Sequence, residues 1–186
     1  MPYLPQNTGL LIIDVQKGLD EPRLGKRNNP DAEINMARLL ADWRAKNRPI
    51  YHVQHMSTEP NSPLRPELPG NAIKRIVAPQ GDEPVIQKQV NNAFVGTDLE
   101  ARLRKAGIQS VVCIGLTTEH CVSTTARMAS DLGFKTVVVA DATACHDRTG
   151  FDGIYYPAET IHTLELVSLQ NEFATILMTD ELLGAG

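Results

Sequence analysis

The chain has 186 residues, of which 42% are hydrophobic and 22% charged, and its net charge at neutral pH is −4. This length suits one domain, residues 1–186, and the composition is that of a soluble globular protein. The negative charge and the lack of a clustered basic stripe exclude nucleic-acid binding, and apolar runs of about six residues are too short to span a membrane. The first residues lack a secretory pattern, and three cysteines form no disulfide framework, so we expect a cytoplasmic protein.

Apolar runs and amphipathic segments alternate along the chain. Residues 9–14 form a continuous apolar run that ends in Asp14, which is typical of a strand buried on both faces of a parallel sheet. Helical periodicity and capping residues predict helices, and short apolar runs predict strands. In chain order, we expect a helix over 30–43, strands at 49–53 and 84–88, a helix over 97–106, a strand at 110–114, a helix over 121–132, a strand at 135–141, a helix over 157–170 and a strand at 173–177.

This order predicts a three-layer α/β sandwich of the Rossmann-like type, with a mostly parallel six-stranded sheet and helices on both faces. Ligand sites in such sheets lie beyond the carboxyl ends of the strands. Asp14, Lys88 and Cys121 each stand at or just after such an end, so the topology should bring them together. Residues 57–81 are rich in Pro and Gly and predict a long surface segment, either a lid or an interface.

Cys121 occupies a position where a nucleophile could be activated. It follows the predicted strand 110–114 and opens the next helix, whose free N–H groups and dipole would favour a thiolate and could hold an oxyanion. A thiol also needs a base or a nearby cation, and Asp14 and Lys88 could supply these. Each has a simpler alternative: Asp14 as a turn cap, Lys88 as a solvated edge residue and Cys121 as inert packing. Cys113, inside an apolar strand, is expected to be a small buried hydrophobe.

Several stretches resemble the isochorismatase-like cysteine hydrolases, a family that includes nicotinamidases and N-carbamoyl amidohydrolases. The resemblance runs from Thr8 to Leu183 and is most specific around Cys121. It is carried by residues 11–16, 85–88, 91–94, 115–127, 139–142 and 162–165.

The resemblance implies a catalytic triad of Asp14, Lys88 and Cys121. It also implies a cis peptide between Leu116 and Thr117, which would aim the Thr117 N–H, beside the Cys121 N–H, at the substrate oxyanion. The implied reaction is hydrolysis of a C–N bond in a small amide, carbamoyl or ureido substrate through a Cys121 thioester. We expect it to need no metal and no cofactor. Family members commonly form dimers, tetramers or larger rings, so we expect a homo-oligomer.

Four further residues are expected to bind the substrate because they lie close to the triad in sequence or at a neighbouring strand end: Gln16, His55, Asn92 and Phe94. His120 is adjacent to Cys121 but would point about 100° away from it on a helix, so it is not expected to be the base. Three polar residues after the strand at 135–141 are expected to have structural roles in turns: Asp141, Asp147 and Arg148.

Alternatives to this interpretation remain open. Nicotinamidases resemble one another in an Asp-x-His metal segment, whereas residues 51–55 offer His52 and His55 without that Asp, which favours packing or hydrogen bonding over a metal site. A nicotinamidase-type amidase is still a second candidate. True isochorismatases lack the cysteine, so Cys121 argues against vinyl-ether cleavage. A non-catalytic or regulatory assembly protein of the same fold, and redox sensing through Cys121, are further candidates.

Overall fold

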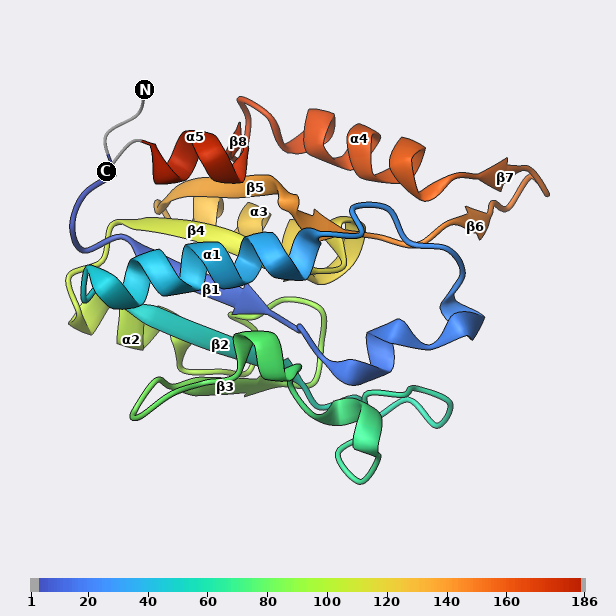
Figure 1. Ribbon diagram of the computed structural model, residues 1–186, viewed down its shortest axis with the longest axis horizontal. Helices are drawn as coiled ribbons and strands as arrows, with labels where there is room; N and C mark the ends of the chain where they lie inside the picture. Colours follow the sequence, from blue (N-terminus) through green and yellow to red (C-terminus); the bar gives the residue numbers. More distant parts are fainter. Residues whose placement is uncertain (1–3, 185–186) are drawn as a thin grey trace.

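A six-stranded sheet forms the centre of the computed structural model, which describes residues 4–184 (Figure 1). The strand order is β3-β2-β1-β4-β5-β8, and every neighbouring pair is parallel. The strands are β1 (Gly9–Ile13), β2 (Ile50–His55), β3 (Val85–Lys88), β4 (Ser110–Leu116), β5 (Lys135–Ala144) and β8 (Thr175–Leu177). The predicted α/β sandwich is therefore confirmed, and its sheet is parallel throughout.

Side chains point alternately to the two faces of the sheet, and on the buried strands both sets are apolar. Helices therefore cover both faces. Leu10 and Ile12 of β1 pack in one core with α1 (Ala32–Ala45) and α5 (Thr179–Leu183). Leu11 and Ile13 pack in the other core, with α2 (Leu99–Lys105), α3 (Ser123–Asp131) and α4 (Ala158–Leu169). The continuous apolar run of β1 thus serves two cores, as the sequence pattern predicts.

The strand order reverses between β1 and β4, which places the carboxyl ends of these two strands at the topological switch point. Gly115 of β4 lies opposite Ile13 of β1 with a φ of 127°. A Cβ atom at this position would collide with the main chain of Ile13, so only glycine allows the two strands to approach here. The residues that follow β1 and β4 are therefore brought close together.

Some elements differ from those predicted. The strand expected at 135–141 extends to Ala144, and the strand expected at 173–177 begins only at Thr175. A short antiparallel hairpin of β6 (Arg148–Thr149) and β7 (Tyr155–Tyr156) projects from the body of the protein (Figure 1). Its strands of two residues are too short to leave a periodic signal in the sequence.

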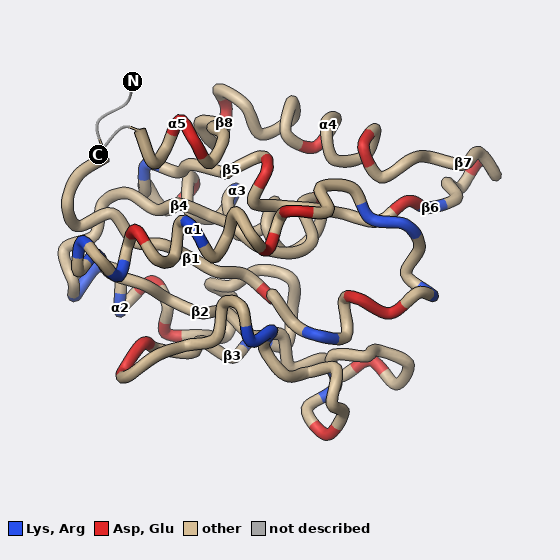
Figure 2. Tube along the Cα trace, in the orientation of Figure 1, with Lys and Arg blue, Asp and Glu red and all other residues tan. Residues whose placement is uncertain are grey.

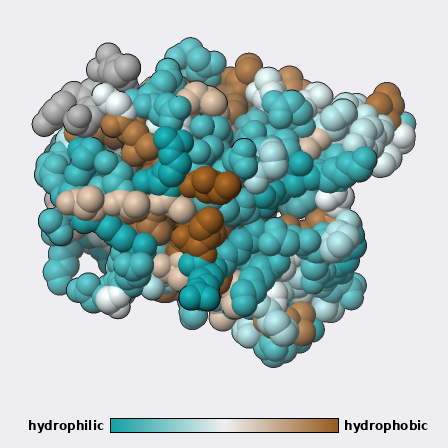
Figure 3. Space-filling view, in the orientation of Figure 1, coloured by the Kyte–Doolittle hydropathy of each residue, from teal (hydrophilic) through white to brown (hydrophobic). Residues whose placement is uncertain are grey.

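Acidic and basic residues are interspersed over the elements seen in Figure 2. Most of the face in Figure 3 is hydrophilic, with hydrophobic residues also present at the projecting end of the molecule. Three of the exposed large apolar side chains belong to the projecting segment: Phe151, Ile154 and Tyr155. Within residues 4–184, no helix has both the length and the apolar character needed to cross a membrane.

Candidate active site

Asp14 and Lys88 meet across the carboxyl edge of the sheet. Asp14 directly follows β1 and has a φ of 51°, in the left-handed region that Asp tolerates better than most residues. Lys88 is the last residue of β3 and pairs in register with His55 at the end of β2. Because β2 lies between β3 and β1, the Lys88 side chain reaches past His55 to Asp14. Both charged side chains are almost completely buried, with 0% of the Lys88 and 1% of the Asp14 side chain exposed.

The Lys88 ammonium lies at the centre of the site. Its Nζ donates to Asp14 Oδ2 at 2.6 Å, to His55 Nδ1 at 3.0 Å and to the Val90 carbonyl at 3.0 Å. The Cys121 sulfur is 3.4 Å from the same nitrogen. Four acceptors thus compete for three N–H groups. Since His55 accepts at Nδ1, a neutral His55 carries its proton on Nε2.

Cys121 lies in a π turn, Thr118–Val122, that leads directly into α3. Its Sγ is 3.7 Å from Asn91 Oδ1 and 3.9 Å from His55 Nδ1. The ligand atoms of Asp14, His55 and Cys121 all lie within 4.8 Å of one another. The peptide bond between Leu116 and Thr117, at the end of β4, is cis. The three residues proposed from sequence as a triad are therefore brought into one cluster.

Burial raises the pKa of the Cys121 thiol well above its usual range, and the negative charge of Asp14 raises it further. The Lys88 ammonium opposes both effects without cancelling them. The sequence favoured a thiolate at the start of the helix, whereas burial and the Asp14 charge favour the protonated thiol in the resting site. A nucleophilic Cys121 needs a base. Asp14 Oδ1 is buried and has no hydrogen-bond partner among the described residues, so this oxygen can accept a proton.

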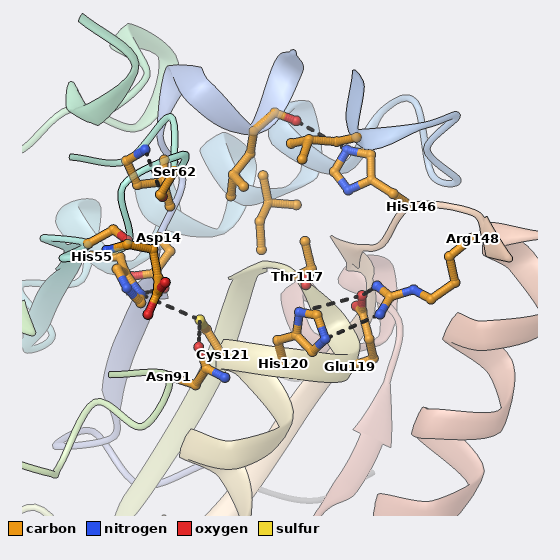
Figure 4. A pocket seen from close by; sticks show the side chains of 16 residues that line it. Asp14, His55, Ser62, Asn91, Thr117, Glu119, His120, Cys121, His146 and Arg148 are labelled. Atoms are coloured by element: carbon orange, nitrogen blue, oxygen red, sulfur yellow. Dashed lines mark hydrogen bonds and ion pairs between the residues drawn. The ribbon is translucent and has the colours of Figure 1, made fainter. Parts of the chain in front are cut away.

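A cavity of about 320 Å³ opens over this cluster (Figure 4). Asp14, His55, Asn91 and Cys121 lie at one end, and a second polar group lies at the other. In that second group, Arg148 Nη2 bonds to Glu119, and Arg148 Nη1 is 3.3 Å from His120 Nε2. The remaining lining residues are Leu19, Leu24, Ser57, Glu59, Ser62, Leu64, Leu116, Thr117 and His146. Residues 57–64 of the long Pro- and Gly-rich segment thus form part of the wall.

Of the four predicted substrate-binding residues, only His55 lines this cavity. Gln16 is fully buried, and its amide holds the main chain of His55: Nε2 donates to the His55 carbonyl at 3.0 Å, and Oε1 accepts from the His55 N–H at 2.9 Å. Asn71 donates to the same carbonyl at 2.8 Å. Gln16 therefore positions His55, and its prediction as a substrate-binding residue is corrected.

Asn92 and Phe94 also turn away from the cavity. Asn92 Nδ2 donates to the Thr124 carbonyl at 3.2 Å, and Phe94 stacks on Phe134 with ring centroids 6.2 Å apart. Their neighbour Asn91 faces the Cys121 sulfur instead. A loop has no fixed period, so the sequence could not tell which of two adjacent asparagines points inward.

Sequence reasoning also missed the second polar group. Glu119 and His120 are adjacent to Cys121, which was the available signal, but Arg148 was expected to serve only a turn. The other two residues that were expected to serve turns, Asp141 and Asp147, do have structural roles. Asp141 accepts from the Thr179 N–H at the start of α5, and Asp147 accepts from the Lys26 N–H.

His52 and His55 do not form a shared metal site. They lie three residues apart on β2 and therefore point to opposite faces. His52 Nε2 is 2.8 Å from Glu83 Oε2, and burial lowers the pKa of His52. Cys113 is completely buried, as predicted, and burial raises its pKa to about 12.

Sequence and structure comparisons with known proteins give one consistent result. A sequence model of the isochorismatase domain matches residues 8–181. The chain belongs to the isochorismatase family. It is 46% identical over 180 residues to the isochorismatase family protein YrdC of Bacillus subtilis, covering 97% of this chain and 96% of that protein. The isochorismatase family is a family of hydrolases, and this chain is one of its hydrolases.

Two further relatives support this assignment. The crystal structure of an isochorismatase-family protein from Chromobacterium violaceum superposes with a TM-score of 0.96 at 39% identity, covering 100% of this chain and 96% of that one. Streptothricin hydrolase of Streptomyces noursei is 33% identical over 141 residues, which span 74% of this chain and 50% of that protein.

Proposed function

We propose that this isochorismatase-family hydrolase cleaves the C–N bond of a small amide, carbamoyl or ureido compound through a Cys121 thioester. The observation that carries the proposal is the buried cluster in which the Lys88 ammonium contacts both Asp14 and the Cys121 sulfur. A nucleophile, a base and a cation are the three groups that such a reaction needs. The cluster lies at the floor of a cavity large enough for a small molecule.

In the first half of the reaction, the unpartnered Oδ1 of Asp14 takes the thiol proton of Cys121. Lys88 stabilises the thiolate at 3.4 Å, and the sulfur attacks the substrate carbonyl carbon. The N–H groups of Thr117 and Cys121 hold the oxyanion, a contribution that typically amounts to about 10²–10³ in rate per donor. Asp14 then gives its proton to the departing ammonia or amine as the C–N bond breaks.

In the second half, Asp14 acts as a base again. It takes a proton from water, whose oxygen attacks the thioester carbon. The C–S bond breaks, and the sulfur recovers the proton from Asp14. The acid product leaves with the second water proton, and the cluster returns to its resting state.

The charges of the cavity disfavour an anionic substrate. Asp14 is paired with Lys88, and Glu119 is paired with Arg148. An anionic substrate would have to compete with Asp14 or Glu119 for one of these two cations, whereas an uncharged amide needs only hydrogen bonds. Asn91, His55 and His120 can offer those. We therefore expect neutral primary amides, including nicotinamide, and neutral ureido compounds to be better substrates than their carboxylate-bearing analogues.

A screen for ammonia release from such compounds tests the proposal. Hydrolysis by the wild type should fall to background in Cys121→Ala. The matched control, Cys113→Ala, alters a buried thiol inside β4 and should remain active. Adding a chelator should leave the rate unchanged, because Lys88 supplies the cation. Undiminished hydrolysis by Cys121→Ala, or no release from any compound, would contradict the proposal.

We also propose that the protein self-associates and acts in the cytoplasm, as the family resemblance and the sequence pattern suggest. Light scattering of the purified chain should give a mass that is a multiple of 20.4 kDa. A mass equal to one chain at micromolar concentration would contradict self-association.

A further inference from the structure

The floor of the cavity brings together three atoms of the kinds that transition metals bind. They are a carboxylate oxygen of Asp14, Nδ1 of His55 and Sγ of Cys121. His55 Nδ1 is 3.7 Å from Asp14 Oδ2 and 3.9 Å from Cys121 Sγ. Ligand atoms around four-coordinate zinc lie about 3.3–3.7 Å from one another. The third pair, Asp14 and Cys121, lies within 4.8 Å, so a contraction of at most about 1.3 Å would convert the cluster into three legs of a tetrahedral site.

His55 is already set up to act as a ligand. Its Nδ1 accepts an N–H of Lys88, so the lone pair points into the cluster. Gln16 and Asn71 fix its main chain, which limits how far the ring can move.

The Lys88 ammonium occupies the position that a metal would need. Its Nζ is 2.6 Å from Asp14 Oδ2, 3.0 Å from His55 Nδ1 and 3.4 Å from Cys121 Sγ. A single internal cation thus contacts all three candidate ligands. An external cation must displace it, and a dication close to an ammonium would be strongly repelled.

From this geometry we propose that Asp14, His55 and Cys121 form an inhibitory site for a thiophilic divalent cation such as Zn²⁺, with Lys88 as a built-in competitor. The Cys121 proton leaves to solvent as the sulfur–metal bond forms. Lys88 gives up Asp14 and His55 and retains the Val90 carbonyl. Water from the cavity takes the fourth position. The bound metal blocks the nucleophile. No oxidation or reduction takes place.

Cobalt(II) offers a direct probe, because coordination by a thiolate produces a charge-transfer absorption band. The full-length wild type should show this band on titration with Co²⁺, and Zn²⁺ should abolish it by competition. Cys121→Ala should show no band. His55→Ala should bind at least about tenfold more weakly, since loss of an outer partner alone typically costs about 10- to 100-fold. The matched control is His120→Ala, which alters a cavity histidine with 51% of its side chain exposed and should stay within about twofold of wild type.

Lys88→Met is the decisive variant, because misfolding could not produce tighter metal binding. Without the competing ammonium and its repulsion of a dication, this variant should bind Co²⁺ and Zn²⁺ at least about tenfold more tightly than wild type. Equal or weaker binding by Lys88→Met would overturn the proposal, as would wild-type affinity in His55→Ala. The readout is metal binding and not turnover, so failure here would leave the proposed amide hydrolysis to be judged by ammonia release.

Discussion

Replacing Asp14 with Asn should make Cys121 more reactive toward a simple alkylating reagent while abolishing hydrolysis. The Asp14 charge raises the pKa of Cys121, and the two groups lie no more than 4.8 Å apart. At that distance, and at an effective dielectric constant of about 20, the repulsion between carboxylate and thiolate is about 3.5 kcal/mol. Removing it should increase the thiolate fraction at pH 7 by about 10- to 100-fold after allowance for relaxation.

Iodoacetamide labelling followed by intact-protein mass spectrometry measures this effect. Cys113 and Cys145 are both 0% exposed and should not react in the folded protein, so a single added mass reports Cys121. Lys88→Met is the opposite arm, because it removes the charge that stabilises the thiolate at 3.4 Å, and labelling should fall by at least about tenfold. Labelling of Asp14→Asn at or below the wild-type rate would refute this electrostatic reasoning.

Three further predictions concern the same site. Labelling of wild-type Cys121 should keep rising with pH beyond pH 9, because a raised pKa delays formation of the thiolate; a plateau below pH 8 would contradict this. In urea unfolding, Lys88→Met should lower the free energy of unfolding by about 3–5 kcal/mol, because it leaves the buried Asp14 carboxylate without its ion-pair partner. Lys74→Met should lower the free energy of unfolding by only about 1–2 kcal/mol, since its partner Glu33 is still paired with Arg27. Equal destabilisation by Lys88→Met and Lys74→Met would contradict this expectation. Gly115→Ala should lose about 3 kcal/mol or more through its collision with Ile13. Gly107 has open space around it, so Gly107→Ala should lower the free energy of unfolding by only about 1 kcal/mol in the same assay. Equal destabilisation by Gly115→Ala and Gly107→Ala would contradict the predicted collision.

The sequence was informative about the sheet because buried parallel strands leave an unmistakable pattern. The run from Gly9 to Ile13 is apolar at every position since it faces a core on both sides. The ends of such strands then locate Asp14, Lys88 and the turn that carries Cys121. The hairpin around Phe151 left no such pattern, because it contributes nothing to either core.

Side-chain direction in the loops was beyond the sequence. Gln16 and Asn92 both lie within a few residues of the triad, yet one is buried against His55 and the other is bonded to α3. The pairing of Glu119 with Arg148 joins residues that are distant along the chain and became visible only in three dimensions. Burial also raises the pKa of Cys121, and the depth of this side chain could not be read from the sequence.

During turnover, Cys121 should carry the acyl group of the substrate. Rapid acid quenching of the wild type with an amide that it hydrolyses, followed by peptide mass spectrometry, tests this claim most directly. We expect an added acyl mass on the peptide that contains Cys121, together with loss of turnover in Cys121→Ala. Steady ammonia release while Cys121 stays unmodified, together with ammonia release by Cys121→Ala, would contradict this expectation.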